Sequence, residues 1–464
     1  MAQRMPSSET RVAVGVGGVL LGGAITVLGL LVLISTHTSG LWVILFLLPI
    51  LLAASWPAFL RQARRERDAR LAQLLMLALV LKLFGSLVRY WVAIHVYEGV
   101  ADAIQYHQVG ADLARRFAAG HFDTGLSSLS STDFIRFFTG VIYTVTGPSI
   151  YAGFLLYSWL AFWGMFFLYQ AFTIAVPDGN RRSYARLLFF LPSMLYWPSS
   201  IGKEAWMLFA LGLAAKGTAR LLTGRTWGGL VLAGTGLWLA TLVRPHVGGM
   251  AALGLLVAYL LARPPRRLGM LGAVIKLFGL AVLLVVAVVL LGQIQRYLLD
   301  KGIDPAEGVN SVLAESARRT SGGGSGFQAP STTTSLLGLP YATVTILFRP
   351  FPFEAHNAQA AVTALESTLL LCLTVARSRT IWRAVRHLRR WPYVAFVVVY
   401  TAGFVVAFAS ISNFGILARE RVQLLPFFFV LLAVPGGRRR HGPSAAPAAD
   451  QQRRVDAGRQ LARA

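Results

Sequence analysis

Long apolar runs separated by short polar links make up most of the chain. The runs at 12–35, 41–60, 71–96 and 149–176 are each at least 20 residues long, and an α-helix of that length crosses the hydrocarbon core of a bilayer. Their apolar positions are continuous rather than alternating, which is the pattern of membrane helices and not of barrel strands. The sequence therefore predicts an all-α, polytopic integral membrane helical bundle with about twelve transmembrane helices.

Two segments differ from this pattern. The segment 187–199 contains Pro192 and Pro198, so we expect a broken helix whose freed backbone groups are satisfied by neighbouring helices. The segment 134–146 is too short to span and is predicted to be a short re-entrant or interfacial helix on the outer side. The other predicted spans are 205–222, 228–242, 247–262, 270–291, 358–376, 393–410 and 416–434.

Arginine-rich links set the predicted orientation. The link 61–70 has five arginines, and further basic links follow after alternate spans; such links stay in the cytoplasm. We therefore expect a multi-pass plasma-membrane protein with both termini cytoplasmic. The predicted parts are a cytoplasmic N-terminus at 1–11, a transmembrane domain at 12–435 and a disordered cytoplasmic tail at 436–464. Outer loops are expected at about 97–133 and 292–357. The run 12–35 is too long for a signal peptide and is predicted to be a retained anchor.

Composition supports a membrane protein and excludes other classes. Hydrophobic residues are 55% of the chain, charged residues 14%, and the mean hydropathy is +0.60, as in membrane proteins. A net charge of +25 would suggest nucleic acid in a soluble protein. Here the arginines fall in links between spans, so we expect anionic lipid headgroups and no nucleic acid. The single cysteine, Cys372, excludes a disulfide within the monomer and a cysteine metal site. No cofactor or metal is predicted.

The outer side carries an unusual set of charges. The stretch 347–357 holds Arg349, Glu354 and His356, and Glu366 lies about two turns into the span that follows. Charged residues inside membrane segments are functional by default, although a structural ion pair to Arg or Lys would also satisfy Glu366. We therefore expect this stretch to line a pocket for an anionic substrate.

Three more outer segments contribute charges. Lys203 and Glu204 are expected to open a helix whose positive end suits a phosphate, with an interfacial anchor as the alternative. Arg244 and His246 flank Pro245 at another turn, where simple snorkelling is the alternative. Arg419 and Arg421 start the last span, and an interfacial charge cluster is the alternative there.

The first outer loop contributes the acidic end of the predicted site. Asp102 and Tyr106 are one helical turn apart, and His107 follows directly. A solvated amphipathic helix is the alternative. The outer cations, Lys203, Arg244, Arg349, Arg419 and Arg421, would suit a pyrophosphate, whose oxygens arginine binds in pairs. The carboxylates Asp102, Glu204, Glu354 and Glu366 are candidates to deprotonate a hydroxyl. Motifs of phosphate-loop ATPases, zinc proteases and serine hydrolases are absent from the sequence.

Several segments resemble bacterial membrane glycosyltransferases of the GT-C type and the related polysaccharide repeat-unit polymerases, including actinobacterial proteins. They are D-A-I-Q-Y-H at 102–107, LPSMLYWPSSIGKE at 191–204, LFRPFPFEAHN at 347–357 and NFG-x-x-A-R-x-R at 413–421. The resemblance implies a catalytic acid on the first outer loop, at Asp102. It also implies that outer arginines hold the donor pyrophosphate: Arg244, Arg349, Arg419 and Arg421.

These observations together predict sugar transfer at the outer leaflet, from a polyprenyl-phosphate- or pyrophosphate-linked saccharide, for cell-envelope glycan synthesis. The expected catalytic residues are Asp102, Glu354 and His107. The expected substrate-binding residues are Lys203, Glu204, Arg244, His246, Arg349, Glu366, Arg419 and Arg421. One alternative is a transporter or flippase of anionic lipid-linked saccharides, for which Lys82, Arg89 and Lys276 would begin a path. The other is a non-catalytic subunit of the envelope polysaccharide machinery.

Overall fold

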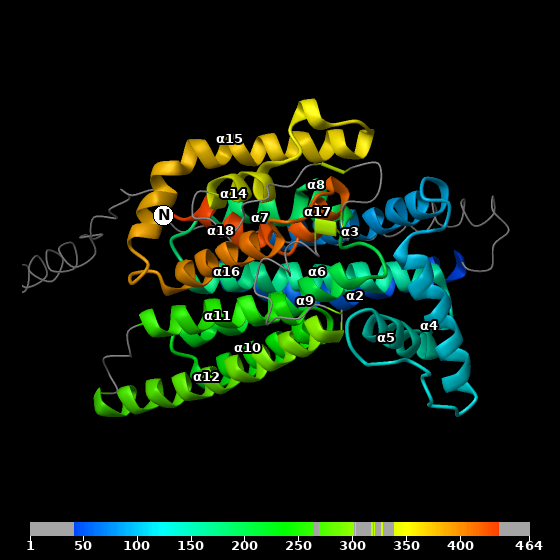
Figure 1. Ribbon diagram of the computed structural model, residues 1–464, viewed down its shortest axis with the longest axis horizontal. Coiled ribbons are helices and arrows are strands. Elements are labelled where there is room, and N and C mark those ends of the chain that lie inside the picture. The colour runs from blue at the N-terminus through cyan, green and yellow to red at the C-terminus, as the bar shows by residue number, and fades with distance from the viewer. Residues whose placement is uncertain are drawn as a thin grey trace, which may run out of the picture.

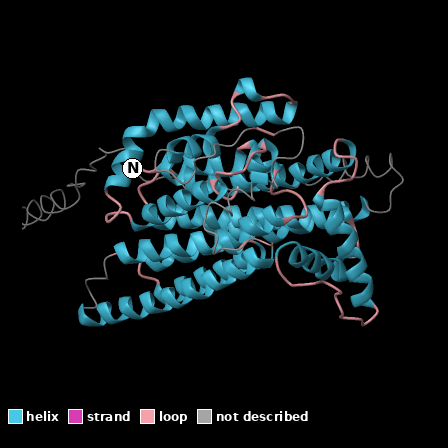
Figure 2. Ribbon diagram, in the orientation of Figure 1, coloured by secondary structure: helices cyan, strands magenta, loops and turns pink. Residues whose placement is uncertain are grey.

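The computed structural model describes residues 41–262, 269–300 and 338–435, together with residues 302, 317, 318, 320, 326 and 327. The described chain folds into sixteen α-helices and one short 3-10 helix (Figure 2), so the predicted helical class is confirmed. The predicted anchor at 12–35, the basic link at 263–267, most of the long outer excursion and the tail at 436–464 lie outside the described residues.

Six of the described helices are long and apolar enough to cross a membrane. They are α2 (Leu41–Glu66), α3 (Ala69–His95), α6 (Ile150–Ala175), α9 (Lys203–Leu222), α12 (Gly269–Asp300) and α15 (Ala358–Arg386). Shorter apolar helices accompany them: α10 (Thr226–Val243), α11 (Pro245–Leu261), α14 (Gly338–Phe348) and α16 (Pro392–Phe408). This set of helices is that of a multi-pass membrane protein.

The long helices run roughly side by side along the long axis of the molecule (Figure 1). In that view α6 and α9 lie near the middle, with α15 along one side and α12 along the other. Two amphipathic helices, α4 (Asp102–Ala118) and α5 (Ser131–Thr146), pack against each other at one end. The predictions of a helix in the first outer loop and of a separate short helix near 134–146 are both confirmed.

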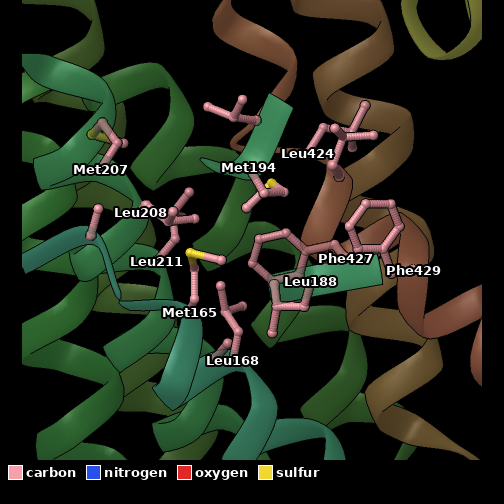
Figure 3. Packing of buried hydrophobic residues seen from close by; sticks show 14 of the residues in the cluster. Met165, Leu168, Leu188, Met194, Met207, Leu208, Leu211, Leu424, Phe427 and Phe429 are labelled. Carbon is pink, nitrogen blue, oxygen red and sulfur yellow. The ribbon is translucent and has the colours of Figure 1, made fainter. Parts of the chain in front are cut away.

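Small residues let the central helices approach closely. A Cβ atom on Gly212 of α9 would lie 2.3 Å from the carbonyl oxygen of Gly164 on α6. A Cβ atom on Gly236 of α10 would lie 2.2 Å from the backbone nitrogen of Ala214. Because lipid chains are as apolar as the side chains, close packing of this kind holds membrane helices together. Figure 3 shows part of the apolar interior, with Met165, Leu168, Leu188, Met194, Met207, Leu208, Leu211, Leu424, Phe427 and Phe429.

The short helices confirm one prediction and add detail to two others. The segment after the 177–180 link is broken as predicted, into α7 (Arg181–Phe190) and α8 (Pro192–Tyr196). The segment 416–434, predicted as one span, is divided into α17 (Phe414–Arg421) and α18 (Leu425–Ala433). Within the outer loop predicted at about 292–357, the last part forms α14 and a 3-10 turn, η3 (Pro352–Glu354).

Candidate functional site

Side chains of alternating charge join α4, α9, α17 and the turn between α10 and α11. Arg419 donates from Nη1 to Asp102 Oδ2 at 2.7 Å and from Nε to Glu204 Oε1 at 2.8 Å. Arg244 donates from Nη2 to the same Glu204 oxygen at 3.1 Å and to Glu420 Oε1 at 2.6 Å. A second contact joins Arg244 Nη1 to Glu420 Oε2. We call these five residues the ion ladder; they bring together positions as far apart in sequence as 102 and 419.

The ion ladder runs from solvent into the protein. The Asp102 side chain is 53% exposed and that of Arg419 is 26% exposed, whereas Glu204 is only 3% exposed. Arg244 and Glu420 are also buried. Buried ion pairs are stable only when further hydrogen bonds satisfy their remaining atoms. Gln423 supplies one, since its Nε2 donates to Glu420 Oε2 at 2.8 Å.

Local sequence explains how these side chains are placed. Arg244 is the residue between α10 and α11, and Pro245 follows it at the first position of α11, where proline is preorganised for a helix. Asn413 caps α17 by accepting the backbone N–H groups of Gly415 and Ile416. That cap fixes where α17 begins, and therefore where Arg419 and the residue after it point.

Lys203 and Tyr106 lie beside the ladder. Lys203, the first residue of α9, donates from Nζ to Ser131 Oγ at 3.2 Å, at the start of α5. Burial, followed by the negative charges of Glu204 and Asp102, raises the pKa of Tyr106 to about 12. The phenol therefore stays protonated at neutral pH and can only donate or accept a hydrogen bond there.

His107 and His246 are placed next to other elements. The Nδ1 atom of His107 is 2.9 Å from the Tyr143 hydroxyl on α5, and burial lowers the pKa of the His107 ring. The ring of His246, at the start of α11, packs on Phe408 with centroids 5.7 Å apart. Neither contact involves a carboxylate of the ladder.

Arg349 and Glu354 form a second, separate pair. Arg349 Nε donates to Glu354 Oε1 at 3.0 Å, and Glu354 Oε2 accepts the backbone N–H of Phe351 at 2.8 Å. The guanidinium also lies over the rings of Phe327 and Phe414, 4.4 and 5.1 Å from their centroids. Burial raises the pKa of Glu354, but the hydrogen bonds from Arg349 and Phe351 outweigh it and lower the pKa overall.

Arg421 and Glu366 hold backbone groups. Arg421 Nη1 donates to the carbonyl oxygens of Leu347 and Arg349, both at 3.0 Å, and so caps the end of α14. Glu366 Oε2 accepts the backbone N–H of Ser193, in the first turn of α8, at 2.8 Å. Three of their buried atoms, Arg421 Nε and Nη2 and Glu366 Oε1, have no hydrogen-bond partner among the described residues.

The residues that were predicted to begin a transport path also bind protein groups. Lys82 is fully buried in α3 and donates from Nζ to the carbonyl oxygen of Met194, in α8, at 2.6 Å. Arg89 donates to the Tyr196 hydroxyl at 2.9 Å. Lys276 donates to the carbonyl oxygens of Leu260 and Ala262 at the end of α11. Lys82 and Arg89 of α3, together with Glu366 of α15, therefore hold the short helix α8 in place.

The structure groups most of the predicted site residues into three sets, which do not include Lys203, His107 and His246. Asp102, Glu204, Arg244 and Arg419 meet in the ion ladder, Arg349 pairs with Glu354, and Glu366 and Arg421 support α8 and α14. Glu420 belongs to the ion ladder, although it was not predicted to be a site residue. Its position between two arginines was the available signal. Among the described residues, no group of three or more His, Cys, Asp or Glu side chains could hold a metal ion.

No protein family, curated protein or solved structure matches this chain.

Proposed function

We propose that the protein is a multi-pass membrane glycosyltransferase or polysaccharide polymerase. It would use a polyprenyl-phosphate- or pyrophosphate-linked saccharide at the outer leaflet. The observation that carries the proposal is the hydrogen bond between Asp102, exposed at the start of α4, and Arg419, which is anchored to the buried Glu204. It places a carboxylate and a cation side by side at the open end of a buried polar network.

The proposed chemistry uses both members of that pair. The acceptor oxygen bonds to the anomeric carbon as the bond from that carbon to the phosphate oxygen breaks. The acceptor proton moves to the Asp102 carboxylate, which acts as general base, and the electron pair stays with the leaving phosphate. Arg419 and Lys203 stabilise that phosphate, and electrostatic stabilisation of this type is usually the largest catalytic contribution. The step is metal-independent.

The rest of the predicted arrangement belongs to the same proposal. About twelve spans with both termini in the cytoplasm put α4, the start of α9 and α17 on the outer side. Arg349 and Glu354 would contact the donor next to α17. The partners would be membrane lipids and the machinery of envelope polysaccharide synthesis.

A flippase of the same lipid is the second candidate, and the contacts favour it less. It needs polar groups along a path through the membrane domain. Lys82, Arg89 and Lys276 each bind protein carbonyl or hydroxyl groups, so these groups support neighbouring helices rather than line a path.

The proposal is tested with Asp102→Asn in lipid nanodiscs supplied with polyprenyl-phosphate-linked radiolabelled sugars and oligosaccharide acceptors. Loss of a general base lowers transfer by about 100-fold to 10,000-fold. The matched control is Asp112→Asn, which alters an exposed carboxylate on the same helix that pairs with Arg115 and Arg116, and full activity is expected. Transfer by Asp102→Asn within twofold of wild type would remove Asp102 from the mechanism. Lipid movement between leaflets without a new glycosidic bond would indicate the flippase.

A further inference from the structure

We infer that Arg419 is exchanged between two anions. In the structure it holds Asp102, and the phosphate of the lipid donor takes the place of Asp102 when it binds. Asp102 therefore becomes available as a base only when the donor is present. This inference rests on the proposed function, and it adds how the same site is controlled.

The two ion pairs of Arg419 differ in how easily they are broken. The pair with Glu204 is buried, with the carboxylate 3% exposed, and uses the Nε side of the guanidinium. Breaking it would leave an unpaired charge inside the protein, which is strongly unfavourable. The pair with Asp102 uses Nη1, and the Asp102 side chain is 53% exposed. A half-exposed pair of this kind costs less to break than a buried one, so Asp102 is the partner that leaves.

The geometry of Arg419 suits a phosphate at the vacated position. A guanidinium has five N–H donors, and the contacts to Glu204 and Asp102 use one on Nε and one on Nη1. The edge formed by Nη1 and Nη2 binds phosphate oxygens in pairs. The pyrophosphate of a pyrophosphate-linked donor carries a larger negative charge than a carboxylate, so it competes well for this edge. It also repels Asp102 once it is bound.

This exchange imposes an order on the reaction. While Arg419 donates to Asp102 Oδ2, the guanidinium holds the carboxylate against α17. Once the phosphate holds Arg419, Asp102 can turn to the acceptor hydroxyl. The donor must therefore bind before the acceptor is activated.

The test measures binding of farnesyl phosphate to wild type, Asp102→Asn and Asp112→Asn in nanodiscs. Asparagine removes the competing charge, so Asp102→Asn should bind farnesyl phosphate about twofold to tenfold more tightly, while transfer is lost. Asp112→Asn should bind as wild type does, and thermal unfolding checks that all three proteins are folded. Arg419→Lys keeps the charge but loses the paired donors, and weaker binding is expected.

The outcomes separate this inference from the proposed function. If wild type binds the lipid and transfers sugar, but Asp102→Asn binds it no more tightly, the exchange is wrong and the proposed function stands. If Asp102→Asn binds more tightly and still transfers sugar, the exchange stands and Asp102 is not the base. If folded wild type does not bind farnesyl phosphate, the proposed donor site fails, and the exchange fails with it.

Discussion

Replacing Arg244 by leucine should destabilise the protein strongly. Arg244 lies between Glu204 and Glu420 in the ion ladder and donates to both. All three side chains are buried. Leucine fills part of the same volume without charge, so the main effect is that two buried carboxylates lose a shared cation.

The magnitude follows from the contact geometry. At an effective dielectric constant of about 20, two unit charges about 4 Å apart attract by about 4 kcal/mol. Removing one member of a buried pair costs about 3–5 kcal/mol, because the remaining charge is left without compensation. Glu204 keeps Arg419 as a partner, so most of the loss falls on Glu420. We expect a decrease of about 3–5 kcal/mol in the free energy of unfolding.

Reversible unfolding in mixed detergent micelles, followed by tryptophan fluorescence, measures this change. The control is Arg115→Leu, which removes an arginine whose side chain is 72% exposed and which pairs with Asp112; it should cost about 1 kcal/mol or less. The double variant Arg244→Leu with Glu420→Leu removes the stranded charge and should recover part of the loss. A cost below about 1 kcal/mol for Arg244→Leu would show that the ion ladder does not stabilise the folded protein to this extent.

The remaining predictions concern packing, pH and activity. Gly236→Val should lower the unfolding free energy by about 1–3 kcal/mol or more, because its Cβ would meet the Ala214 nitrogen at 2.2 Å. Gly234→Val on the same helix meets nothing within 4 Å and is the control; equal losses in thermal melts would contradict the packing argument. Glu354 has a lowered pKa in the folded state, so its stabilisation is present above the ordinary carboxylate pKa of about 4.3 and is lost as pH falls through the lower folded value. Melting temperatures measured against pH should fall less steeply in acid for Glu354→Gln than for wild type, and identical slopes would refute this. Arg349→Ala should abolish sugar transfer while the protein stays folded in membranes, and unchanged product would remove Arg349 from the mechanism.

The sequence predicted the helices better than their ends. Apolar runs identified the long helices because every backbone group in lipid must be satisfied within the helix. Pro192 marked the break before α8. The break between α17 and α18 was missed because the run at 422–434 is apolar apart from Gln423. Pro426, in the first turn of α18, was the available signal. The apolar run of α14 at 338–348 was assigned to the outer loop because it is too short to span a bilayer.

The candidate site was predictable as a set of residues but not as a set of pairs. The positive-inside rule drew attention to Arg244 and Arg419 because outer arginines are unusual. It carried no information on which acid each would meet, since Arg419 and Asp102 are 317 positions apart. Glu420 was not predicted because the arginines were expected to bind the phosphate of a ligand. In the structure Arg244 binds carboxylates of the protein itself.

The support of α8 has a consequence for how the protein is made. Lys82 enters the membrane in α3, but the carbonyl it binds belongs to Met194, 112 residues later. Glu366 arrives 173 residues after the Ser193 N–H that it accepts. A lysine at the centre of an inserting helix costs about 2.5–3.5 kcal/mol. The hydrogen bond that Lys82 makes in the folded protein can form only after Met194 has been synthesised. Assembly of this domain should therefore depend on insertion machinery that shelters the first helices until the carboxyl-terminal half has emerged.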